Sequence, residues 1–447
     1  MSLVELRERI ERKRALLAVI GLGYVGLPVA CEFARAGFDV CGLEIQQERV
    51  QKINVGISPI EGTEPGLAEL LYDVVQSKRL AATTDYGTLR ERDVILISVE
   101  TPVDAENTPR YEALRTVLLS LGPVLKPGAL VIVESTIAPG TMRDLVTPLL
   151  ERSSGLRLNE GFFLGHCPER VMPGRLLANL RSVSRVVGGM TPLTADTMVA
   201  LYGHVVQADL DATDCITAEL VKTTENAYRD VQIAFANEVA LICETVGGDV
   251  WRVRELVNKS PGRAMLLPGA GVGGHCIPKD PWLLAYGARD QRARLRLIPA
   301  ARAINDTMPE RMVELLEEAL VTQDRQLSAA SILVLGYAYL EESDDTRNSP
   351  SAVLADLLLA AGARVIVHDP FVPGYKGDLL QMANGCDAAV LMVRHRAYLD
   401  LDLDALGAAL QTPVLIDGRH AFSAADVVDK GLVYRGIGLG TASAENA

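Results

Sequence analysis

Residues 271–280, GVGGHCIPKD, place one cysteine between a histidine and a Lys-Asp pair within a glycine-rich turn. Glycine has no Cβ, so a ligand can approach the backbone of such a turn closely. A thiolate is a strong nucleophile, and neighbouring positive charges promote its formation. Cys276 is therefore a candidate nucleophile, with Lys279 and Asp280 supplying charge beside it, although a cysteine taken alone is more often a packing residue. His275 is either part of this chemistry or an ordinary loop residue.

A second glycine motif, GLGYVG at residues 21–26, stands between an apolar run at 15–20 and a helical pattern at 27–35. Strand, glycine turn and helix in this order are typical of a dinucleotide site, where the helix start attracts the pyrophosphate. Glu44 ends the next predicted strand, and a carboxylate there binds ribose hydroxyls and repels a 2′-phosphate. The pattern favours NAD over NADP. Arg49 lies either beside the adenosine or in solvent.

Two further predicted strands, 94–98 and 130–134, are followed by threonines, Thr101 and Thr136. The carboxyl ends of the strands in an α/β sheet are where ligands bind, so these hydroxyls are candidates for contact with the nicotinamide or a catalytic water. Simple helix caps are the alternative interpretation. A nicotinamide cofactor together with a cysteine nucleophile indicates oxidation of an alcohol or aldehyde through a thioester to an acid.

The segment 213–248 lacks proline and has helical spacing, which predicts a helix of roughly 30 residues that bridges two domains. Lys222, Asn226 and Arg229 lie at i, i+4 and i+7 and therefore share one helical face. A cation, an amide and a second cation can bind an oxyanion or an anionic sugar nucleotide. A solvated polar face is the alternative.

The order of predicted elements is α/β, then helices, then α/β again from about residue 331. We expect two Rossmann-like, doubly wound domains joined by a central helical region with one long helix. The expected domains are an NAD-binding domain at 1–208, a central helical dimerisation domain at 209–310 and a substrate-binding α/β domain at 311–447.

Composition excludes several functional classes. The chain has 447 residues, a net charge of −13 and no Cys-x2-Cys pair among its seven cysteines, so we expect neither nucleic-acid binding nor a metal site. No apolar run reaches the ~18 residues that span a bilayer, and the charged start lacks a signal-peptide pattern. We expect a reduced, cytoplasmic protein with no membrane partner.

The motifs together resemble the nucleotide-sugar 6-dehydrogenases, the family that oxidises UDP-glucose and UDP-N-acetylhexosamines. The resemblance extends from Gly21 to Arg419 and rests on these segments in the family's order: GLGYVGLPVA, STIAPGT, CPERVMPG, AELVKTTENAYRD, PGAGVGGHCIPKDP, DDTRNSP and DGR. Within the family the chain is most similar to the UDP-N-acetyl-D-mannosamine group, with the UDP-N-acetyl-D-glucosamine group as the alternative. The resemblance implies NAD as cofactor, a UDP-N-acetylhexosamine as substrate and a homodimer or higher homo-oligomer formed through the central helix.

The resemblance also implies residue roles. Cys276 would form a thiohemiacetal and then a thioester, Lys222 would transfer a proton, and Asn226, Asp280, Glu169 and Thr136 would support them. Cofactor contacts would come from Gly21, Gly23, Tyr24, Val25, Gly26, Glu44, Arg49, Thr101, Thr136, Lys279 and Arg347. Substrate contacts would come from Arg170, Val171, Lys222, Asn226, Arg229, Arg263, Gly271, Gly273, Tyr339 and Arg419, together with the backbone of 267–273.

Two positions depart from the family pattern. Acetamido-sugar members commonly show His-Pro-Arg before the cysteine loop, whereas this chain has Ser260 and a displaced Arg263. Leu340 follows Tyr339 where relatives carry a lysine. Two rival functions are a two-electron β-hydroxyacid dehydrogenase, which needs no cysteine loop, and a non-catalytic sugar-nucleotide sensor, against which the set of Cys276, Lys222 and Asp280 argues.

Overall fold

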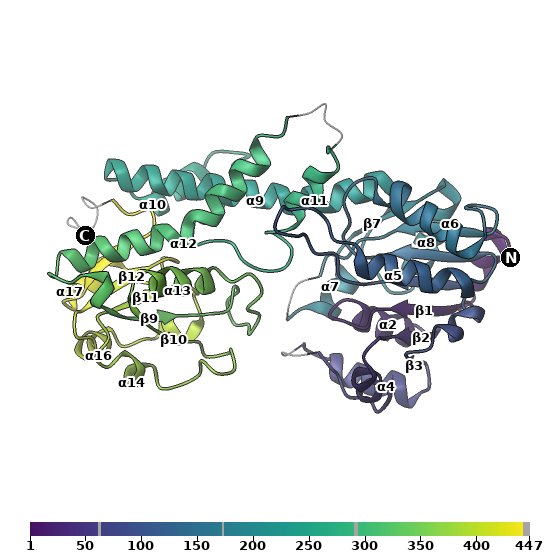
Figure 1. Cartoon of the computed structure of the whole chain (residues 1–447), viewed down its shortest axis with the longest axis horizontal. Coiled ribbons are helices and arrows are strands. Elements are labelled where there is room, and N and C mark those ends of the chain that lie inside the picture. The colour runs from purple at the N-terminus through teal and green to yellow at the C-terminus, as the bar shows by residue number, and fades with distance from the viewer. Residues whose placement is uncertain (61–63, 172–173, 290–293, 441–447) are drawn as a thin grey trace. The chain divides into compact units, whose positions relative to one another are not determined.

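The structure is a computed structural model, and it describes residues 1–60, 64–171, 174–289 and 294–440. The chain divides into two compact units (Figure 1). The first contains Met1–Glu225 and a segment that starts at Trp282, and the second contains Asn226–Pro281 and the residues from Arg294 onward. Among the helices of these described residues, none has the length and hydropathy needed to cross a membrane.

The first unit is built on an eight-stranded sheet with the strand order β3-β2-β1-β4-β5-β6-β7-β8. Every pair is parallel except β6 and β7. The order reverses between β1 and β4, which is where doubly wound sheets bind their ligands. The strands are β1 Leu16–Ile20, β2 Asp39–Leu43, β3 Leu80–Thr83, β4 Val94–Ile97, β5 Ala129–Val133, β6 Phe162–His166, β7 Arg185–Gly189 and β8 Leu210–Asp214.

Helices cover both faces of this sheet, which explains why its central strands are apolar throughout. Leu17 and Val19 of β1 pack into the core on one face, and Ala18 and Ile20 pack into the core on the other. The helical segments are α1 Leu3–Glu11, α2 Gly26–Arg35, α3 Gln47–Asn54, α4 Leu67–Gln76, η1 Tyr86–Glu91, α5 Glu112–Leu121, η2 Gly122–Val124, η3 Met142–Val146, α6 Thr147–Ser154, α7 Leu176–Ser182 and α8 Pro192–Tyr202.

The second unit has a five-stranded, all-parallel sheet with the order β10-β9-β11-β12-β13. One of its inner strands again alternates between two cores, with Ile332 and Val334 packing into one and Leu333 and Leu335 into the other. The strands are β9 Ser331–Leu335, β10 Arg364–His368, β11 Ala388–Leu391, β12 Val414–Asp417 and β13 Val433–Gly436. The helical segments are α10 Val250–Asn258, α12 Leu297–Val321, η4 Leu327–Ala329, α13 Pro350–Ala360, α14 Leu379–Ala383, α15 Arg396–Leu399, α16 Leu403–Ala409 and α17 Ala424–Asp429.

One long helix, α9 Cys215–Val246, contributes residues to both units and confirms the predicted bridging helix. Asp214 caps its start, since Oδ1 accepts a hydrogen bond of 2.8 Å from the backbone of Thr217. Gly247 ends it with a φ of +77°, a left-handed conformation that suits glycine at a helix end. A short helix, α11 Asp280–Tyr286, starts directly after the cysteine loop.

Candidate active site

The glycine turn between β1 and α2 has no room for side chains at its first and third glycines. A Cβ on Gly21 would lie 2.4 Å from the carbonyl oxygen of Ser98, and one on Gly26 would lie 1.9 Å from that of Gly21. Among the described atoms other than those of Gly23 and its two chain neighbours, nothing lies within 4 Å of a Cβ built on Gly23. The turn is therefore tight on its inner side and open at Gly23, which is the arrangement that a pyrophosphate needs.

Tyr24 links this turn to a second loop. Its hydroxyl hydrogen-bonds the carboxylate of Glu64, which also accepts bonds from the backbone of Gly174 at 2.7 Å and Leu176 at 3.3 Å. Val25 directly precedes α2 and packs against the core. The cofactor turn and the start of α7 are thus held by one carboxylate.

Glu44 points back toward the glycine turn from the end of β2. Its carboxylate accepts hydrogen bonds from the backbone of Leu22 at 3.3 Å and of Gln46 at 3.1 Å. Arg49 lies beside it, with Nε 3.6 Å from Oε2 of Glu44 and Nη2 donating to the carbonyl of Leu22 at 2.8 Å. This position next to the turn fits the ribose-binding acid of an NAD site, and Arg49 lies against that acid rather than free in solvent.

The loops after β4 and β5 are joined at their bases. Thr101 Oγ1 donates to the carbonyl of Thr136 at 2.6 Å, and Ser135 Oγ accepts from the backbone of Val99 at 2.9 Å. The two predicted threonines therefore meet at the carboxyl edge of the first sheet. Thr101 is buried and Thr136 is half-buried.

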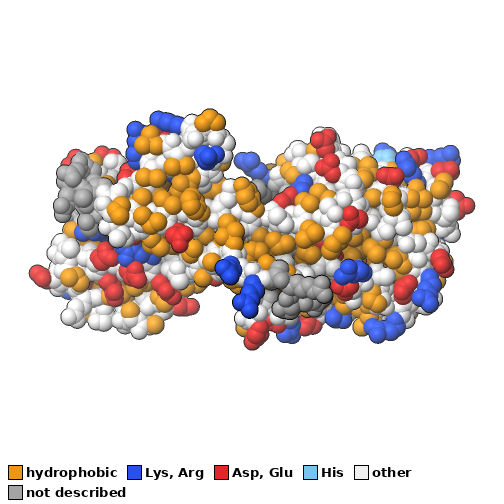
Figure 2. Space-filling view, turned by 90° about the horizontal axis from the view of Figure 1, so that it is seen from above, with side chains coloured by type: hydrophobic (Ala, Val, Ile, Leu, Met, Phe, Trp, Pro, Cys, Tyr) orange, Lys and Arg blue, Asp and Glu red, His pale blue; other side chains and the backbone are white. Residues whose placement is uncertain are grey.

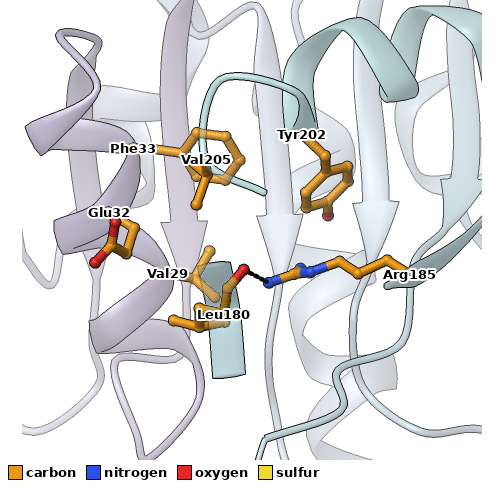
Figure 3. Close-up of a pocket in the computed structure, with 7 residues that line it drawn as sticks. All are labelled: Val29, Glu32, Phe33, Leu180, Arg185, Tyr202 and Val205. Atoms are coloured by element: carbon orange, nitrogen blue, oxygen red, sulfur yellow. Dashed lines mark hydrogen bonds between the residues drawn. The ribbon is translucent and has the colours of Figure 1, made fainter. Parts of the chain in front are cut away.

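Glu169, in the loop after β6, is buried and ion-paired with Arg185 at the start of β7. Figure 3 shows Arg185 extending between Tyr202 and Leu180, whose carbonyl accepts a hydrogen bond of 3.5 Å from Nη2. Figure 3 also shows the recess beside this arginine, which is too narrow to hold a water molecule. Its lining residues are Val29, Glu32, Phe33, Leu180, Arg185, Tyr202 and Val205. Sequence reasoning did not identify Arg185, because nothing in the chain marks an arginine 16 residues from its partner.

The neighbouring substrate candidates lie at the same loop. Arg170 pairs with Glu225 and donates to the carbonyl of Ser184 at 2.7 Å, and Val171 is half-buried. Met172 and Pro173, the next residues of the CPERVMPG motif, lie outside the described residues.

The polar stripe of α9 runs from a buried to an exposed environment. Lys222 is 9% exposed, Asn226 is half-buried and Arg229 is exposed. One turn before Lys222, Glu219 accepts hydrogen bonds of 2.7 Å from the backbone of Gly140 and of Met142. The helix is thereby fixed to the loop that follows Thr136, a role for Glu219 that the sequence did not reveal.

Among the cysteines that the structure describes, Cys276 is the exposed one, and its carbonyl accepts bonds from the backbone of Lys279 at 3.1 Å and Asp280 at 2.8 Å. Asp280 is fully buried, with Oδ1 3.3 Å from the ammonium of Lys279 and Oδ2 accepting from Asn226 at 2.5 Å. Burial, and next the charge of Lys279, lower the pKa of His275 to about 4. The histidine is therefore neutral near pH 7, and the cation next to the nucleophile on its own loop is Lys279.

A loop of the second unit supports the glycines before Cys276. A Cβ on Gly273 would lie 2.6 Å from Cβ of Tyr339, so this position requires glycine. The carbonyl of Arg347 accepts a bond of 2.9 Å from the backbone of Gly274, and Asn348 donates to the carbonyl of Gly274 at 3.1 Å. Tyr339 and Arg347 are thus both placed at the cysteine loop.

Arg419 anchors the start of the same loop from the end of β12. Its Nε donates to the carbonyl of Met392 at 2.7 Å and its Nη2 to that of Gly271 at 3.3 Å. Burial lowers the pKa of Arg419. Arg263 is exposed and donates to the carbonyl of Pro261 at 3.4 Å. This hydrogen bond does not involve the cysteine loop.

The structure therefore gathers the candidates in two sets. In the first unit, the sheet's carboxyl edge carries the cofactor turn, Glu44, Thr101, Thr136 and Glu169. Lys222 lies on α9 in the same unit. In the second unit the cysteine loop is surrounded by Asn226, Asp280, Tyr339, Arg347 and Arg419. Among the described residues, no group of His, Cys, Asp and Glu side chains has the arrangement of a metal site.

Comparison with known proteins matches three successive segments of the chain to domains of one family. Residues 15–206 match the NAD binding domain of the UDP-glucose/GDP-mannose dehydrogenase family, residues 216–307 its central domain and residues 333–424 its UDP binding domain.

Individual relatives span nearly the whole length. A UDP-N-acetyl-D-mannosamine dehydrogenase of Pyrococcus horikoshii is 39% identical over 424 residues, 95% of this chain and 99% of the relative. An NDP-N-acetyl-D-galactosaminuronic acid dehydrogenase of Ralstonia solanacearum is 35% identical over 91% of this chain and 96% of the relative.

Solved structures agree with these relationships. A structure of UDP-D-ManNAc dehydrogenase from P. horikoshii superposes with a TM-score of 0.89 at 38% identity, covering 96% of this chain and 99% of the other. One of an NDP-N-acetyl-D-galactosaminuronic acid dehydrogenase from Methanosarcina mazei gives a TM-score of 0.87 at 37% identity and covers 99% of both chains. With all three family domains present in order and a near-complete match to its members, this chain belongs to the UDP-glucose/GDP-mannose dehydrogenase family of NAD-dependent enzymes.

Proposed function

We propose that this protein oxidises C6 of UDP-N-acetyl-D-mannosamine to the carboxylate, giving UDP-N-acetyl-D-mannosaminuronate in a four-electron reaction. The observation that carries the proposal is the exposed Cys276 on a loop fixed by Lys279, Asp280 and Asn226. A two-electron dehydrogenase has no need for a nucleophile in such a setting. The mannosamine substrate is supported by the relatives of that name, which are 32–39% identical over most of the chain.

The residues of the first unit fit NAD, since Gly23 leaves the turn open and Glu44 faces it. When bound, NAD would supply the hydride acceptor, with one NAD molecule used in each of the two oxidation steps. Cys276 adds to the aldehyde to give a thiohemiacetal, and the second oxidation converts this to a thioester. Water then attacks the carbonyl carbon, the C–S bond breaks and the thiolate of Cys276 is regenerated.

The other candidates take supporting roles in this proposal. Lys222 moves the proton on the C6 oxygen and stabilises negative charge there. Glu169 and Thr136 lie beside the hydrolytic water, and Glu169 accepts its proton. Arg170, Arg229, Tyr339 and Arg419 bind the nucleotide sugar, Arg419 through the loop that it anchors.

A different N-acetylhexosamine is the second candidate substrate. Dehydrogenases that act on UDP-N-acetyl-D-glucosamine share much of the sequence pattern. Relatives named for N-acetyl-D-galactosaminuronic acid are 34–35% identical to this chain. The C6 chemistry is the same for each epimer, so the choice depends on the residues that contact the sugar ring.

We also propose a homodimer formed through α9. Tyr228, Phe235, Ile242 and Val246 are 62, 59, 55 and 73% exposed, and their spacing of seven, seven and four residues places them on one helical face. Figure 2 shows apolar side chains gathered where α9, α10 and α12 lie in the second unit. Such a surface is typical of an interface with another chain. The scattered cysteines, six of which are buried, support a reducing, cytoplasmic location.

The experiment is an NADH count on a panel of the mannosamine, glucosamine and galactosamine UDP-N-acetylhexosamines and UDP-glucose. Two NADH per sugar, with UDP-N-acetyl-D-mannosamine preferred, is the expected result, whereas one NADH contradicts the four-electron reaction. Cys276→Ser should form no acid and still bind NAD. Cys386→Ala, at a buried cysteine of the same unit, controls for loss of a thiol. Phe235→Glu should convert the dimer to a monomer in light scattering.

A further inference from the structure

Two buried carboxylates share one guanidinium at the carboxyl edge of the first sheet. Glu134 follows β5, Glu169 follows β6, and Arg185 begins β7, which runs antiparallel to β6 and so starts at the same edge. These residues are 2, 7 and 3% exposed. Arg185 pairs directly with Glu169, while its Nη1 lies 3.9 Å from Oε1 of Glu134. With two acids and one cation, the group cannot be neutral while both acids are ionised.

The two carboxylates have partners of different kinds. Glu169 faces a guanidinium, which can only donate hydrogen bonds. Glu134 accepts 2.8 Å bonds from the hydroxyls of Ser98, at Oε2, and of Tyr202, at Oε1. A hydroxyl can donate or accept, so Glu134 can gain a proton without losing a partner. A proton on Glu169 would instead displace its contact with Arg185.

Charge leads to the same assignment. A buried carboxylate without a compensating cation is costly and takes up a proton instead. Burial, followed by the charge of Glu169, raises the pKa of Glu134 to about 7, against which Arg185 and the two hydroxyls act. The other titratable groups against it are Cys167, whose pKa burial raises to about 12, and Tyr202, whose pKa burial raises well above its usual value. Both stay neutral across the physiological range.

We propose that Glu134 holds the exchangeable proton of this group and thereby sets the charge beside Glu169. Arg185 holds Glu169 in place through their ion pair, and Glu134 is a positioning residue that acts on the reaction through its charge. The consequence for catalysis rests on the proposed role of Glu169 as acceptor of the proton from the hydrolytic water. Loss of the proton from Glu134 places a second negative charge near that acceptor, which makes Glu169 a stronger base and accelerates thioester hydrolysis.

Glu134→Gln tests this directly, because glutamine keeps the shape and the neutral charge, and the Ser98 and Tyr202 hydroxyls can reorient toward its amide. The readout is the rate of acid formation between about pH 5.5 and about pH 9. We expect a rise near pH 7 in the native enzyme that the variant lacks, with a loss of about tenfold above pH 8 and little change below pH 6. An unchanged pH profile, or an equal loss at every pH, contradicts the proposal.

Tyr202→Phe is the matched variant, since it retains Glu134 and removes one donor to its ionised form. It should move the rise to higher pH without abolishing it. Infrared difference spectra of the full chain supply a readout independent of catalysis. A protonated-carboxyl band that disappears on raising the pH through 7, and that is absent in Glu134→Gln, supports the assignment. If no such band is observed, the assignment is wrong. A native enzyme that releases one NADH per sugar refutes the proposed function and leaves this spectral test intact.

Discussion

Asn226 on α9 donates a hydrogen bond of 2.5 Å to Asp280, which accepts it through Oδ2. The other oxygen of Asp280 lies 3.3 Å from the ammonium of Lys279, and its backbone N–H donates to the carbonyl of Cys276. The buried carboxylate therefore joins the long helix to the nucleophile loop. Lys279 compensates its charge, and the neutral amide of Asn226 donates a hydrogen bond to it.

Replacing Asn226 tests this link. Asn226→Ala removes a donor to a buried carboxylate, an interaction worth about 1.5–3 kcal/mol, so turnover should fall by about 10- to 100-fold. Asn226→Asp should be worse, because it places a second negative charge against Asp280. Steady-state rates of acid formation and thermal unfolding of each variant are the measurements. An aspartate variant as active as the native enzyme would show that the hydrogen bond is unimportant.

The two cations of the α9 stripe should fail in different ways. Lys222 is buried and Arg229 is exposed, which suits a role in the chemical step for the first and in binding for the second. Lys222→Ala should lower kcat by about 100- to 1,000-fold, the typical effect of removing one donor to a developing oxyanion. Arg229→Ala should mainly raise KM for the sugar nucleotide. If Lys222→Ala keeps near-normal kcat, Lys222 is an anchor and the assignment is wrong.

Glu44 should determine the choice of cofactor. Its carboxylate faces the glycine turn and is placed to bind ribose hydroxyls. Glu44→Ala should weaken NAD binding by about tenfold, the loss of one charge-assisted interaction, and relax discrimination against NADP. Dissociation constants for both cofactors, measured by calorimetry, give the answer. Unchanged values for both would place the ribose elsewhere.

Local sequence was enough to predict the central strands of the first sheet and the long helix. These strands are apolar because helices bury both of their faces, and α9 has helical spacing between a capping aspartate and a glycine. The strands β3, β6, β8 and β13 were not predicted. β8, for example, reads LDATD and is largely exposed at the sheet edge, so it carries no apolar signal. Its strand conformation comes from its parallel pairing with β7.

The residues of the candidate site also fall into those that the local sequence predicts and those that it does not. The glycines, Glu44 and Cys276 were predictable because their types and spacing are local. Arg185 and Glu219 were not, since each acquires its role through partners that are distant in sequence, Glu169 and the backbone of Gly140 and Met142. Such partners become visible only when strand order and helix packing bring them together.

Glu219 should matter to catalysis although it lies outside the proposed set. Its two oxygens accept from separate backbone amides, those of Gly140 and Met142, and so fix α9 to the Thr136 loop. Glu219→Gln replaces one acceptor by a donor and leaves one amide unpaired, a cost of about 1–3 kcal/mol. We expect lower kcat with little change in NAD affinity. The conservative Glu219→Asp should restore part of the loss, whereas equal losses in both variants would indicate simple destabilisation.

The pH dependence of stability should reflect two buried acids. Burial raises the pKa of Glu134 and of Glu219 from 4.5 to about 7. A carboxyl whose pKa is raised on folding contributes stability that is fully present below its unfolded pKa and is lost as the pH rises through its folded pKa. These two groups should therefore stabilise the fold most below about pH 4.5 and lose that contribution by about pH 7. At 1.36 kcal/mol per unit, each contributes at most about 3 kcal/mol.

Urea denaturation of the full chain at pH 5 and at pH 8 measures this effect. Other carboxylates also titrate, so the informative quantity is the difference between each glutamine variant and the native protein. Glutamine mimics the protonated acid, so Glu134→Gln should be relatively more stable at pH 8 than at pH 5, because the native acid at pH 8 bears the cost of a buried charge. Glu219→Gln should show the same trend around a lower baseline, because it also loses an acceptor. A difference that does not change with pH would mean that neither acid titrates in this range. The reverse trend would mean that the ionised forms are the ones that the fold stabilises.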